Sequence, residues 1–185
     1  DVDEVVIDCS DGVDWIMRNS FGWNNTQPTR SLSVRVIGPG RAISVSSGST
    51  AAPTWVNTTG PVYKTTLAAN SAGSVIDLSI LDSDGFYQRL TAVASTAAVL
   101  ATPGSYFHDG TDLHVRASDS RNLVGDVRMQ PCATTNNMRV PSASQTTYVD
   151  GLHFVGGVPL NYTSAGVVDP LVVCLNCTFQ GSHTT

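Results

Sequence analysis

The amino-acid sequence predicts an all-β protein, and three observations carry this prediction. First, the residues that usually cover helices are almost absent: of 15 acidic residues only Glu4 is a glutamate, and of 10 basic residues only Lys64 is a lysine. Second, the chain contains 20 serines, 20 threonines, 16 glycines and 9 prolines, a mixture that suits strands and turns. Third, apolar and polar residues alternate, most clearly in residues 32–37, with the period of a half-buried strand.

Apolar and alternating runs predict six strands in the first half of the chain. Asp11-Gly12 separates the first two, Gly38-Pro39-Gly40 ends the third, and Asp82-Ser83-Asp84-Gly85 ends the last. The small and polar residues 46–53 indicate a loop. Residues 91–101 are rich in alanine and leucine, and a helical turn or two is expected only there. The predicted strands are residues 5–7, 15–17, 32–37, 42–45, 62–67 and 74–81.

A β-hairpin over residues 105–116 is the clearest local prediction. Asp109-Gly110 lies between two alternating runs, Ser105 to His108 and Leu113 to Arg116. Both residue types tolerate positive φ at the centre of a tight turn, so this dipeptide is a strong hairpin signal.

Two segments near the C-terminus, residues 148–157 and 173–181, share one pattern. Aligned on their phenylalanines, they repeat at a distance of 25 residues. A strand, a one-residue corner and a second strand, repeated at this distance, predict the coils of a solenoid. Glycine and asparagine enter a left-handed corner at low cost, so Gly151 and Asn176 are the expected corners. The residues expected to stack in one shared interior are Leu152, Phe154, Cys177 and Phe179.

Composition argues against two classes of partner. The net charge is −5, the pI is about 5.1 and lysine and arginine form no cluster, so we expect no nucleic-acid binding. The sequence contains no run of 18 apolar residues, so we expect no membrane insertion. The acidic N-terminus, Asp1 to Glu4, lacks the basic and apolar regions of a signal peptide.

Cys174 and Cys177 have the spacing of a metal-binding or redox motif. A structural zinc site needs a second Cys/His pair at similar spacing, and none is present. A thioredoxin-like motif opens a helix, whereas this pair lies in an apolar predicted strand. We therefore expect buried free thiols, no metal and no cofactor. A disulfide that involves Cys9 or Cys132 stays an open alternative.

The hairpin segment resembles a known family. Pro103 to Gly110, then Leu113 to Arg116, then Asp119-Ser120-Arg121, is similar to the region that leads into the coils of right-handed parallel β-helix proteins. These include bacteriophage tail and tailspike proteins and the pectin-lyase-like polysaccharide enzymes. Residues 151–154 and 176–179 are similar to the coil corners of that family. The resemblance covers roughly residues 60–185.

The resemblance implies three consecutive parts. Residues 1–60 form an N-terminal β region, either an early coil or flanking structure. Residues 61–130 form the β region that contains the hairpin, and residues 131–185 form the first parallel β-helix coils. Because the sequence ends directly after the second copy of the repeat, we expect either a fragment of a longer solenoid or a chain whose open end meets another chain.

The resemblance also implies a function. We expect a structural segment of a phage tail or tailspike-like virion protein that contacts host-surface glycans, located in the virion tail or outside the cell. Its implied partners are other virion tail proteins, a host surface polysaccharide and further copies of itself, since tailspike-like β-helices commonly form trimers. Two alternatives stay open: a polysaccharide lyase or hydrolase of the pectin-lyase-like class, and a bacterial extracellular adhesin or filament subunit.

Candidate catalytic carboxylates are few. Glycoside hydrolysis needs two carboxyl groups about 5 to 9 Å apart, and the pairs close in sequence are Asp82/Asp84 and Asp109/Asp112. Turn formation explains the first pair and Asp109, and no later glutamate completes a calcium loop after Asp82. We therefore assign no catalytic residue to this segment and leave the enzyme alternative open. The remaining acidic candidates, one for each predicted coil, are Asp150 and Asp169.

Histidines, aromatic residues and sequons have ordinary structural explanations. His114 and His153 alternate with apolar neighbours and are expected on a solvated strand face, and no G-x-S-x-G elbow supports a Ser/His/Asp triad. Aromatic side chains are candidates for stacking against sugars, although most are expected in the core. Sequons arise by chance in a threonine-rich chain. The other residues considered are His108, His183, Trp15, Trp23, Trp55, Tyr63, Tyr87, Tyr106, Tyr148, Asn24, Asn57, Asn161 and Asn176.

Overall fold

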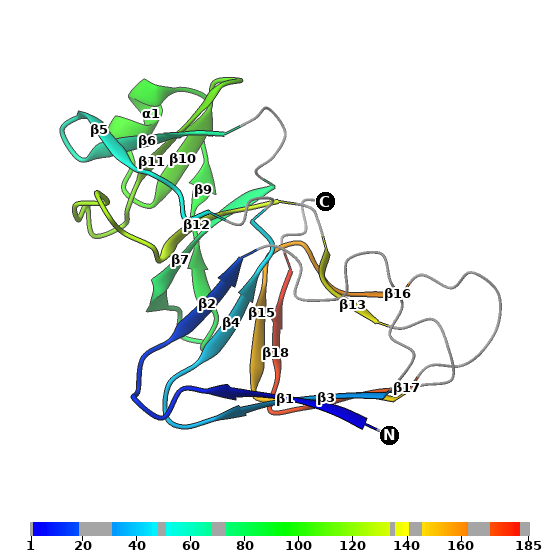
Figure 1. The fold of residues 1–185 in the computed structure, drawn as a ribbon. Helices are drawn as coiled ribbons and strands as arrows, with labels where there is room; N and C mark the ends of the chain where they lie inside the picture. The colour runs from blue at the N-terminus through cyan, green and yellow to red at the C-terminus, as the bar shows by residue number, and fades with distance from the viewer. Residues whose placement is uncertain are drawn as a thin grey trace. The chain divides into compact units, whose positions relative to one another are not determined.

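The computed structural model describes residues 2–18, 31–47, 51–67, 73–133, 136–140, 146–162 and 171–181. The all-β prediction is confirmed, because almost all regular structure in these residues is strand (Figure 1). The one α-helix that they contain, α1 (Thr96–Ala101), lies in the segment where a helical turn was expected. The chain divides into two compact units. We call residues 1–46 with 135–181 the stacked unit, and residues 47–134 the inserted unit.

The stacked unit contains three sheets in which every strand pairing is parallel. Sheet A has the order β1-β3-β14-β17, sheet B has the order β18-β15-β4-β2, and sheet C pairs β13 with β16. The strands are β1 (Val2–Asp8), β2 (Trp15–Arg18), β3 (Ser31–Ile37), β4 (Ala42–Val45), β13 (Asn136–Val140), β14 (Thr146–Asp150), β15 (Leu152–Val155), β16 (Val158–Tyr162), β17 (Leu171–Leu175) and β18 (Thr178–Gln180).

Within the described residues the chain runs from sheet A to sheet B four times, and each such run is called a pass here. The passes are β1 to β2, β3 to β4, β14 to β15, and β17 to β18, and they occur in the same order in both sheets. In Figure 1, β2, β4, β15 and β18 lie side by side in the order of sheet B. Residues 1–46 therefore supply the first two passes.

The 25-residue repeat is confirmed by the strand register. Phe154 pairs with Phe179 and His153 with Thr178, which are the partners that the sequence alignment predicted. Gly151 has φ of 80° and Asn176 has φ of 52°, so both residues form the left-handed corners expected of them. A Cβ at Gly151 would lie 3.1 Å from Cβ of Val36, so the corner also needs the small residue for close stacking.

The interior of the stacked unit is apolar, but one predicted member is wrong. Leu152 and Phe154 are fully buried, and Cys177 is partly buried against them. Phe179 stacks on Phe154 with ring centroids 5.1 Å apart and planes 5° apart, yet it is 43% exposed. Its strand, β18, is the outermost strand of sheet B as described, so no described strand covers its other side. The buried cluster is Ile7, Cys9, Leu32, Val34, Ala42, Val149, Leu152 and Phe154.

The unit boundaries differ from the three consecutive parts expected from the sequence. Residues 1–46 group with 135–181, and the boundaries of the inserted unit lie at 46/47 and 134/135. The hairpin region therefore interrupts the stacked unit between its second and third passes. It does not precede all the passes, as the resemblance implied.

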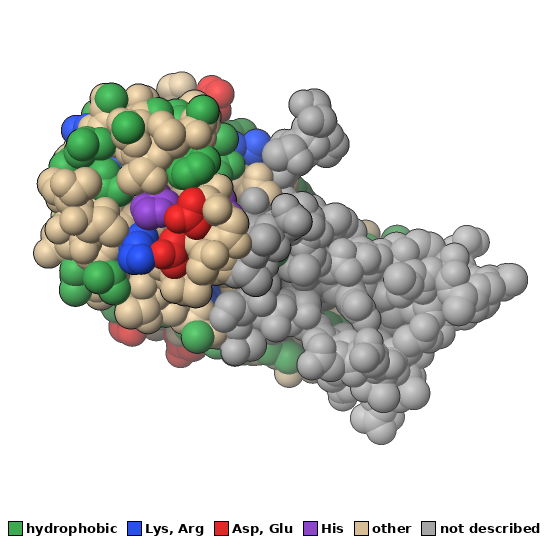
Figure 2. Space-filling view, turned by 90° about the horizontal axis from the view of Figure 1, so that it is seen from above, with side chains coloured by type: hydrophobic (Ala, Val, Ile, Leu, Met, Phe, Trp, Pro, Cys, Tyr) green, Lys and Arg blue, Asp and Glu red, His purple; other side chains and the backbone are tan. Residues whose placement is uncertain are grey.

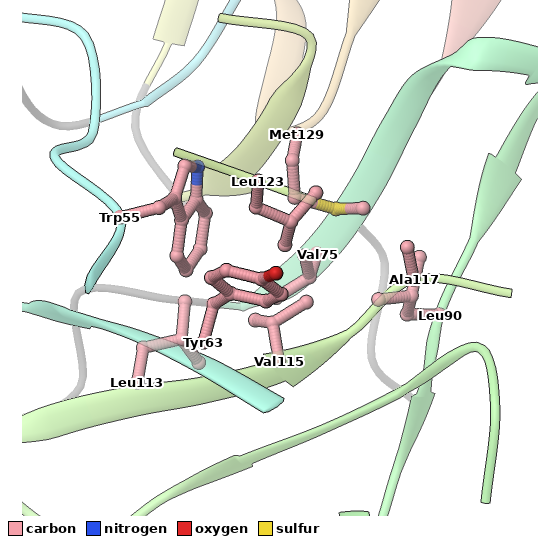
Figure 3. Close-up of a cluster of buried hydrophobic side chains, with 9 residues drawn as sticks. All are labelled: Trp55, Tyr63, Val75, Leu90, Leu113, Val115, Ala117, Leu123 and Met129. Atoms are coloured by element: carbon pink, nitrogen blue, oxygen red, sulfur yellow. The ribbon is translucent and has the colours of Figure 1, made fainter. Parts of the chain in front are cut away.

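The inserted unit contains a five-stranded sheet, β5-β6-β11-β10-β9, and a three-stranded sheet, β12-β7-β8. The strands are β5 (Val56–Thr59), β6 (Val62–Thr66), β7 (Ser74–Leu81), β8 (Tyr87–Arg89), β9 (Thr91–Ala92), β10 (Ser105–His108), β11 (Asp112–Arg116) and β12 (Met129–Cys132). Figure 3 shows its core, in which Trp55 and Tyr63 lie close to Leu113 and Val115 of β11. The other members are Val75, Leu90, Ala117, Leu123 and Met129.

The predicted hairpin is confirmed, and the two predicted runs form its paired strands. β10 and β11 pair antiparallel from Ser105 opposite Arg116 to His108 opposite Leu113. Four residues, 109–112, therefore separate the last paired residues, and of these only Gly110 has positive φ, at 105°. Asp109 has no positive φ and instead closes the turn with its side chain, which accepts hydrogen bonds from the backbone N–H of Thr111 and Asp112.

A buried ionic cluster fixes the loop after β11. Arg121 donates to both carboxylate oxygens of the fully buried Asp77 at 2.6 and 2.8 Å, and to Asp126 at 3.0 Å. Arg121 also donates to Asp119 at 3.2 Å. These bonds compensate the burial of Asp77, which would otherwise oppose folding strongly. The cluster therefore ties residues 119–126 to β7.

We predict that Phe154→Ala lowers the free energy of unfolding by about 3 to 5 kcal/mol, because the ring is fully buried and its removal leaves a cavity. Phe179→Ala, the same change at the paired but exposed position, is the control and should cost clearly less. Urea denaturation of both variants measures the difference. Equal losses at the two positions would contradict the assignment of Phe154 to the interior.

Candidate functional site

The outward face of the five-stranded sheet carries a group of polar side chains. The register places Lys64 opposite His114, Thr66 opposite Asp112, and Phe107 opposite His114 on the other side. Side chains alternate across a strand, so these residues share the face opposite the core residues Tyr63, Leu113 and Val115. Figure 2 shows a face of the molecule where histidine, acidic and Lys/Arg side chains lie together. We call Lys64, Thr66, Asp109, Asp112 and His114 the polar face.

Asp109 closes the hairpin turn and binds His114. Its Oδ1 accepts hydrogen bonds from the backbone N–H of Thr111 at 2.9 Å and of Asp112 at 2.7 Å. Its Oδ2 accepts from Nε2 of His114 at 3.0 Å. The hydrogen bonds from the Asp112 backbone, the His114 side chain and the Thr111 backbone hold the pKa of Asp109 well below its usual value. From the sequence, Asp109 was interpreted only as a turn residue, and its contact with His114 was not predicted.

His114 corrects the expectation of a solvated histidine. Its side chain points away from the core, as predicted, but the residue is only 9% exposed. Phe107 covers one side of the ring, with centroids 6.4 Å apart and planes 23° apart, and Asp109 holds Nε2. Nδ1 is buried and has no hydrogen-bond partner. Strand alternation predicted the direction of the His114 side chain but not that Phe107 and Asp109 cover it.

Lys64 and Asp112 form the second pair of the polar face. Nζ of Lys64 lies 2.5 Å from Oδ2 of Asp112, and Oγ1 of Thr66 donates to Oδ1 at 3.0 Å. The hydrogen bonds from Lys64 and Thr66 lower the pKa of Asp112, and the bond to Asp112 raises the pKa of Lys64. Neither Lys64 nor Thr66 was among the site residues predicted from the sequence. The sequence contained one signal that could have identified Lys64: it is the only lysine of the chain, and it lies in an alternating strand.

A cavity of about 430 Å³ adjoins the polar face. Lys64 and Thr66 belong to both, so the ion pair lies at the rim of the cavity. Gln130, fully buried on β12, also lines it, and its Oε1 has no hydrogen-bond partner. The remaining lining residues are Ser47, Ala51, Ala52, Pro53, Thr54, Val56, Thr65, Leu67 and Pro131. The cavity combines an apolar wall with a few polar groups, the usual composition of a small-molecule site.

The polar face suits binding better than acid–base chemistry. A general acid for glycoside hydrolysis needs a raised pKa. The pKa values of Asp109 and Asp112 are instead lowered by their hydrogen bonds. Nε2 of His114 already contacts Asp109, and its Nδ1 is buried. These groups can hold a polar ligand at the rim, but none is arranged to donate a proton to it.

The other acidic candidates have structural contacts. Oδ1 of Asp82 accepts from the backbone of Asp84 and Phe86, which confirms the turn. Asp150 accepts from Nδ2 of Asn176 at 2.8 Å and so supports the corner of the next pass. Asp169 lies outside the described residues. The described residues therefore bring together Asp109 and Asp112 but do not unite Asp150 with a second candidate carboxylate.

The remaining histidines are also engaged. Nε2 of His108 donates to the backbone oxygen of Leu67 at 2.9 Å. Nδ1 of His153 lies 2.7 Å from Oγ1 of Thr178, and burial lowers the pKa of His153. His153 is partly buried, so its expected solvated position is only partly realised. His183 lies outside the described residues.

The aromatic candidates for sugar stacking are mostly in cores. Trp55, Tyr63 and Tyr87 are buried, and Tyr106 and Tyr148 are partly buried. Trp15 is 49% exposed and lines a second cavity of about 330 Å³ in the stacked unit, together with Val6, Ile7, Asp8, Asp11, Val13 and Asp14. Trp23 and Asn24 lie outside the described residues, and the structure describes no side-chain position for Asn161. The exposed Asn57 donates to backbone oxygens of its own hairpin.

All four cysteines are free thiols. Cys9 and Cys132 are buried, whereas Cys174 and Cys177, which were expected to be buried, are only partly buried. Burial raises the pKa of all four, that of Cys132 to about 12. Within the described ranges, no group of three or more His, Cys, Asp or Glu side chains is placed to hold a metal ion. Nor does any helix in them have the length and apolar character needed to cross a membrane.

Comparison of the chain with protein-family models, with curated proteins and with solved structures found no match.

We predict that Asp109→Asn destabilises the hairpin in a pH-dependent way. A carboxylate whose folded pKa is lowered stabilises the fold above its unfolded pKa of about 3.9, and this stabilisation is lost as the pH falls toward the folded pKa. The difference in Tm between wild type and variant should therefore be largest above about pH 4 and should shrink below it. Thermal unfolding between pH 7 and pH 2 measures this. Asp84→Asn, which removes an exposed carboxylate from another turn, is the control, and a pH-independent difference at Asp109 would contradict the prediction.

Proposed function

We propose that this chain is a structural segment of a tailspike-like phage virion protein and that its inserted unit contacts host-surface glycans. The stacked unit would then be a right-handed parallel β-helix. The observation that carries the proposal is the parallel register of four passes, with a 25-residue step between the last two. Left-handed one-residue corners at Gly151 and Asn176 support the same architecture.

The hairpin supports the proposal from the sequence side. Its residues resemble the region that leads into the coils of tailspike-type β-helices, and the predicted antiparallel pairing is present. Arg121, the last residue of that resemblance, binds the buried Asp77 and so has a structural role in the inserted unit. An inserted unit with its own core is a suitable carrier for a binding site, because the stack can remain regular around the insertion.

Glycan contact is favoured over hydrolysis or elimination by the state of the carboxylates. The neighbouring Asp109 and Asp112 both have lowered pKa values and accept hydrogen bonds at both carboxylate oxygens. Such carboxylates can accept hydrogen bonds from sugar hydroxyls on the polar face, but they are poor proton donors near neutral pH. The adhesin alternative shares the architecture and differs from the proposal in the source of the protein.

Exposed apolar side chains on the outermost passes support assembly of several copies. Val6, Val13 and Trp15 are exposed on the first pass, and Leu171, Leu175 and Phe179 are exposed on the last one. Contiguous exposed apolar surface is typical of interaction sites, and closed symmetry is the usual way in which identical chains bury it. A homotrimer is the symmetry that the family resemblance implies.

We predict that the 185-residue chain forms a trimer, with a mass of about three times 19.5 kDa. Light scattering after size exclusion measures this mass at micromolar protein concentration. Val13→Lys and Leu171→Lys should shift the mass toward the monomer, because each places a charge in the proposed contact surface. Val124→Lys is a matched control, since Val124 is exposed by 61% and Val13 by 62%, but Val124 belongs to the inserted unit. A stable wild-type monomer would contradict the assembly.

We predict that the chain binds immobilised bacterial O-antigen or capsular polysaccharide without cleaving it. Lys64→Met/Asp112→Asn, which removes the ion pair of the polar face without changing the net charge, should weaken binding at least tenfold. Glu4→Gln/Arg35→Met removes the exposed pair of the stacked unit and is the matched control. Biolayer interferometry measures binding. New reducing ends or unsaturated uronate would favour the enzyme alternative, and no binding to any polysaccharide of a broad panel would contradict glycan contact.

A further inference from the structure

The cavity beside β6 has an unusual wall, because one strand edge borders it. β5 pairs with β6 only as far as Val56 opposite Lys64, so in the described residues Thr65, Thr66 and Leu67 line the cavity beyond the end of β5. The backbone N–H of Leu67 donates to Thr111 at 3.0 Å and thus points toward β11. Successive residues of an antiparallel strand point their backbone groups to opposite sides. The N–H and C=O of Thr66 therefore point toward the cavity.

The hydrogen bonds of Asp112 support the same direction for Thr66. Asp112, the cross-strand partner of Thr66, donates its N–H to the Asp109 side chain, and its C=O accepts from the Asp109 backbone. Thr66 and Asp112 are thus a pair that does not exchange backbone hydrogen bonds. The cavity consequently receives one backbone donor and one backbone acceptor from Thr66.

This short edge favours a small ligand over an extended peptide. The backbone groups of Leu67 are already occupied, because its N–H binds Thr111 and its C=O accepts from His108. At Lys64 and the residues before it in β6, pairing with β5 already covers this edge of the strand. Strand addition uses backbone groups of several alternate residues. Thr66 alone offers one donor and one acceptor, which is enough to orient a single ring but not to extend the sheet.

Gln130 adds an independent indication of a ligand. Its Nε2 donates to the backbone oxygen of Val127, which fixes the orientation of the carboxamide. Its Oε1 has no hydrogen-bond partner, although the residue is fully buried and lines the cavity. Leaving a buried acceptor without a donor is unfavourable. A ligand group that donates a hydrogen bond would remove this deficit.

The charge of the site selects a neutral ligand. The Lys64 ammonium at the rim is paired with the Asp112 carboxylate, so the rim offers no excess charge to a phosphate or a uronate. The required ligand groups must both donate and accept, which hydroxyl groups do. Ala52, Pro53 and Pro131 provide apolar wall for the C–H face of a ring, and the volume of about 430 Å³ is in the range of small-molecule sites.

We propose that this cavity binds one uncharged hexose residue of a surface glycan, held by the Thr66 backbone, Gln130 and the rim pair Lys64–Asp112. The proposal rests on the proposed glycan contact and names its ligand class and its site. The hexose would lie with its hydroxyls toward Thr66 and Gln130 and its C–H face against the proline and alanine wall.

A titration of the full ¹⁵N-labelled chain tests the site. The probes are D-glucose, D-galactose, D-mannose and N-acetyl-D-glucosamine, with D-glucuronate as the charged comparison. At least one neutral sugar should shift the Thr66 amide and Gln130 carboxamide resonances with saturation, and glucuronate should bind at least tenfold more weakly. Saturating shifts that avoid Thr66 and Gln130, or no shifts with any neutral sugar, would overturn the proposal.

Three variants separate the cavity from a general effect on folding. Gln130→Met removes the acceptor at similar side-chain length and should weaken binding of the neutral sugar at least tenfold. Ala52→Trp adds bulk at an exposed position of the wall and should abolish binding without touching the core. Gln88→Met is the matched control, because Gln88 lies on β8 outside the cavity lining, and its Oε1 accepts from Ser118. Unchanged sugar binding in both cavity variants would overturn the proposal.

The same variants distinguish failure of this inference from failure of the proposed function. If Ala52→Trp still binds the immobilised polysaccharide as wild type does, the glycan contact lies elsewhere, and only the cavity assignment is overturned. If the wild-type chain binds neither polysaccharide nor free sugar, both proposals are overturned. Loss of both kinds of binding in Ala52→Trp, with Gln88→Met unaffected, supports both.

Discussion

The corner between sheets A and B is the constraint on which the stacked unit depends. A parallel pass can lie on its neighbour only if the chain changes direction at the same point of both. The last two passes meet this condition with single left-handed residues, Gly151 and Asn176. The first two passes use a longer corner, in which the backbone N–H of Cys9 donates to the backbone oxygen of Ile37. Gly38 is required in this corner, because a Cβ there would lie only 2.4 Å from the Ser10 nitrogen. Both solutions keep the apolar side chains in register inside.

Local sequence pattern predicted the strands and the hairpin because alternation and turn residues determine where these elements form. Alternation found the strands at 32–37 and 74–81, and Asp109-Gly110 found the hairpin. The pattern does not contain the identity of a strand's partner. The backbone of Thr146 donates to the side chain of Ser31, 115 residues earlier, so the grouping of the two chain ends into one unit was beyond local reasoning. The predicted burial of Phe179 was wrong for a related reason. Phe179 repeats Phe154 in sequence, but among the described strands it has a neighbour on only one side.

The candidate site was less predictable than the fold because its members come from distant segments. Asp109 and Asp112 were visible as a turn, but their partners Lys64 and His114 join them only through the pairing of β6 with β11. Gln130 joins the cavity from a third strand, and nothing in its sequence context marks it. An unsatisfied acceptor is a property of packing, and only coordinates reveal it.

Two cations of the inserted unit are held in ion pairs, and this limits the ligands that the unit can recognise. Arg121 is bound by Asp77 and Asp126, and Lys64 is bound by Asp112. Because Arg121 and Lys64 are compensated locally, they add little to a long-range field that could attract an ionic ligand. Recognition at such a surface must depend on directed hydrogen bonds and on shape. Neutral glycans present many hydroxyls at fixed angles on an apolar ring, and they match a site with a short backbone edge, one unsatisfied amide oxygen and a proline-lined wall.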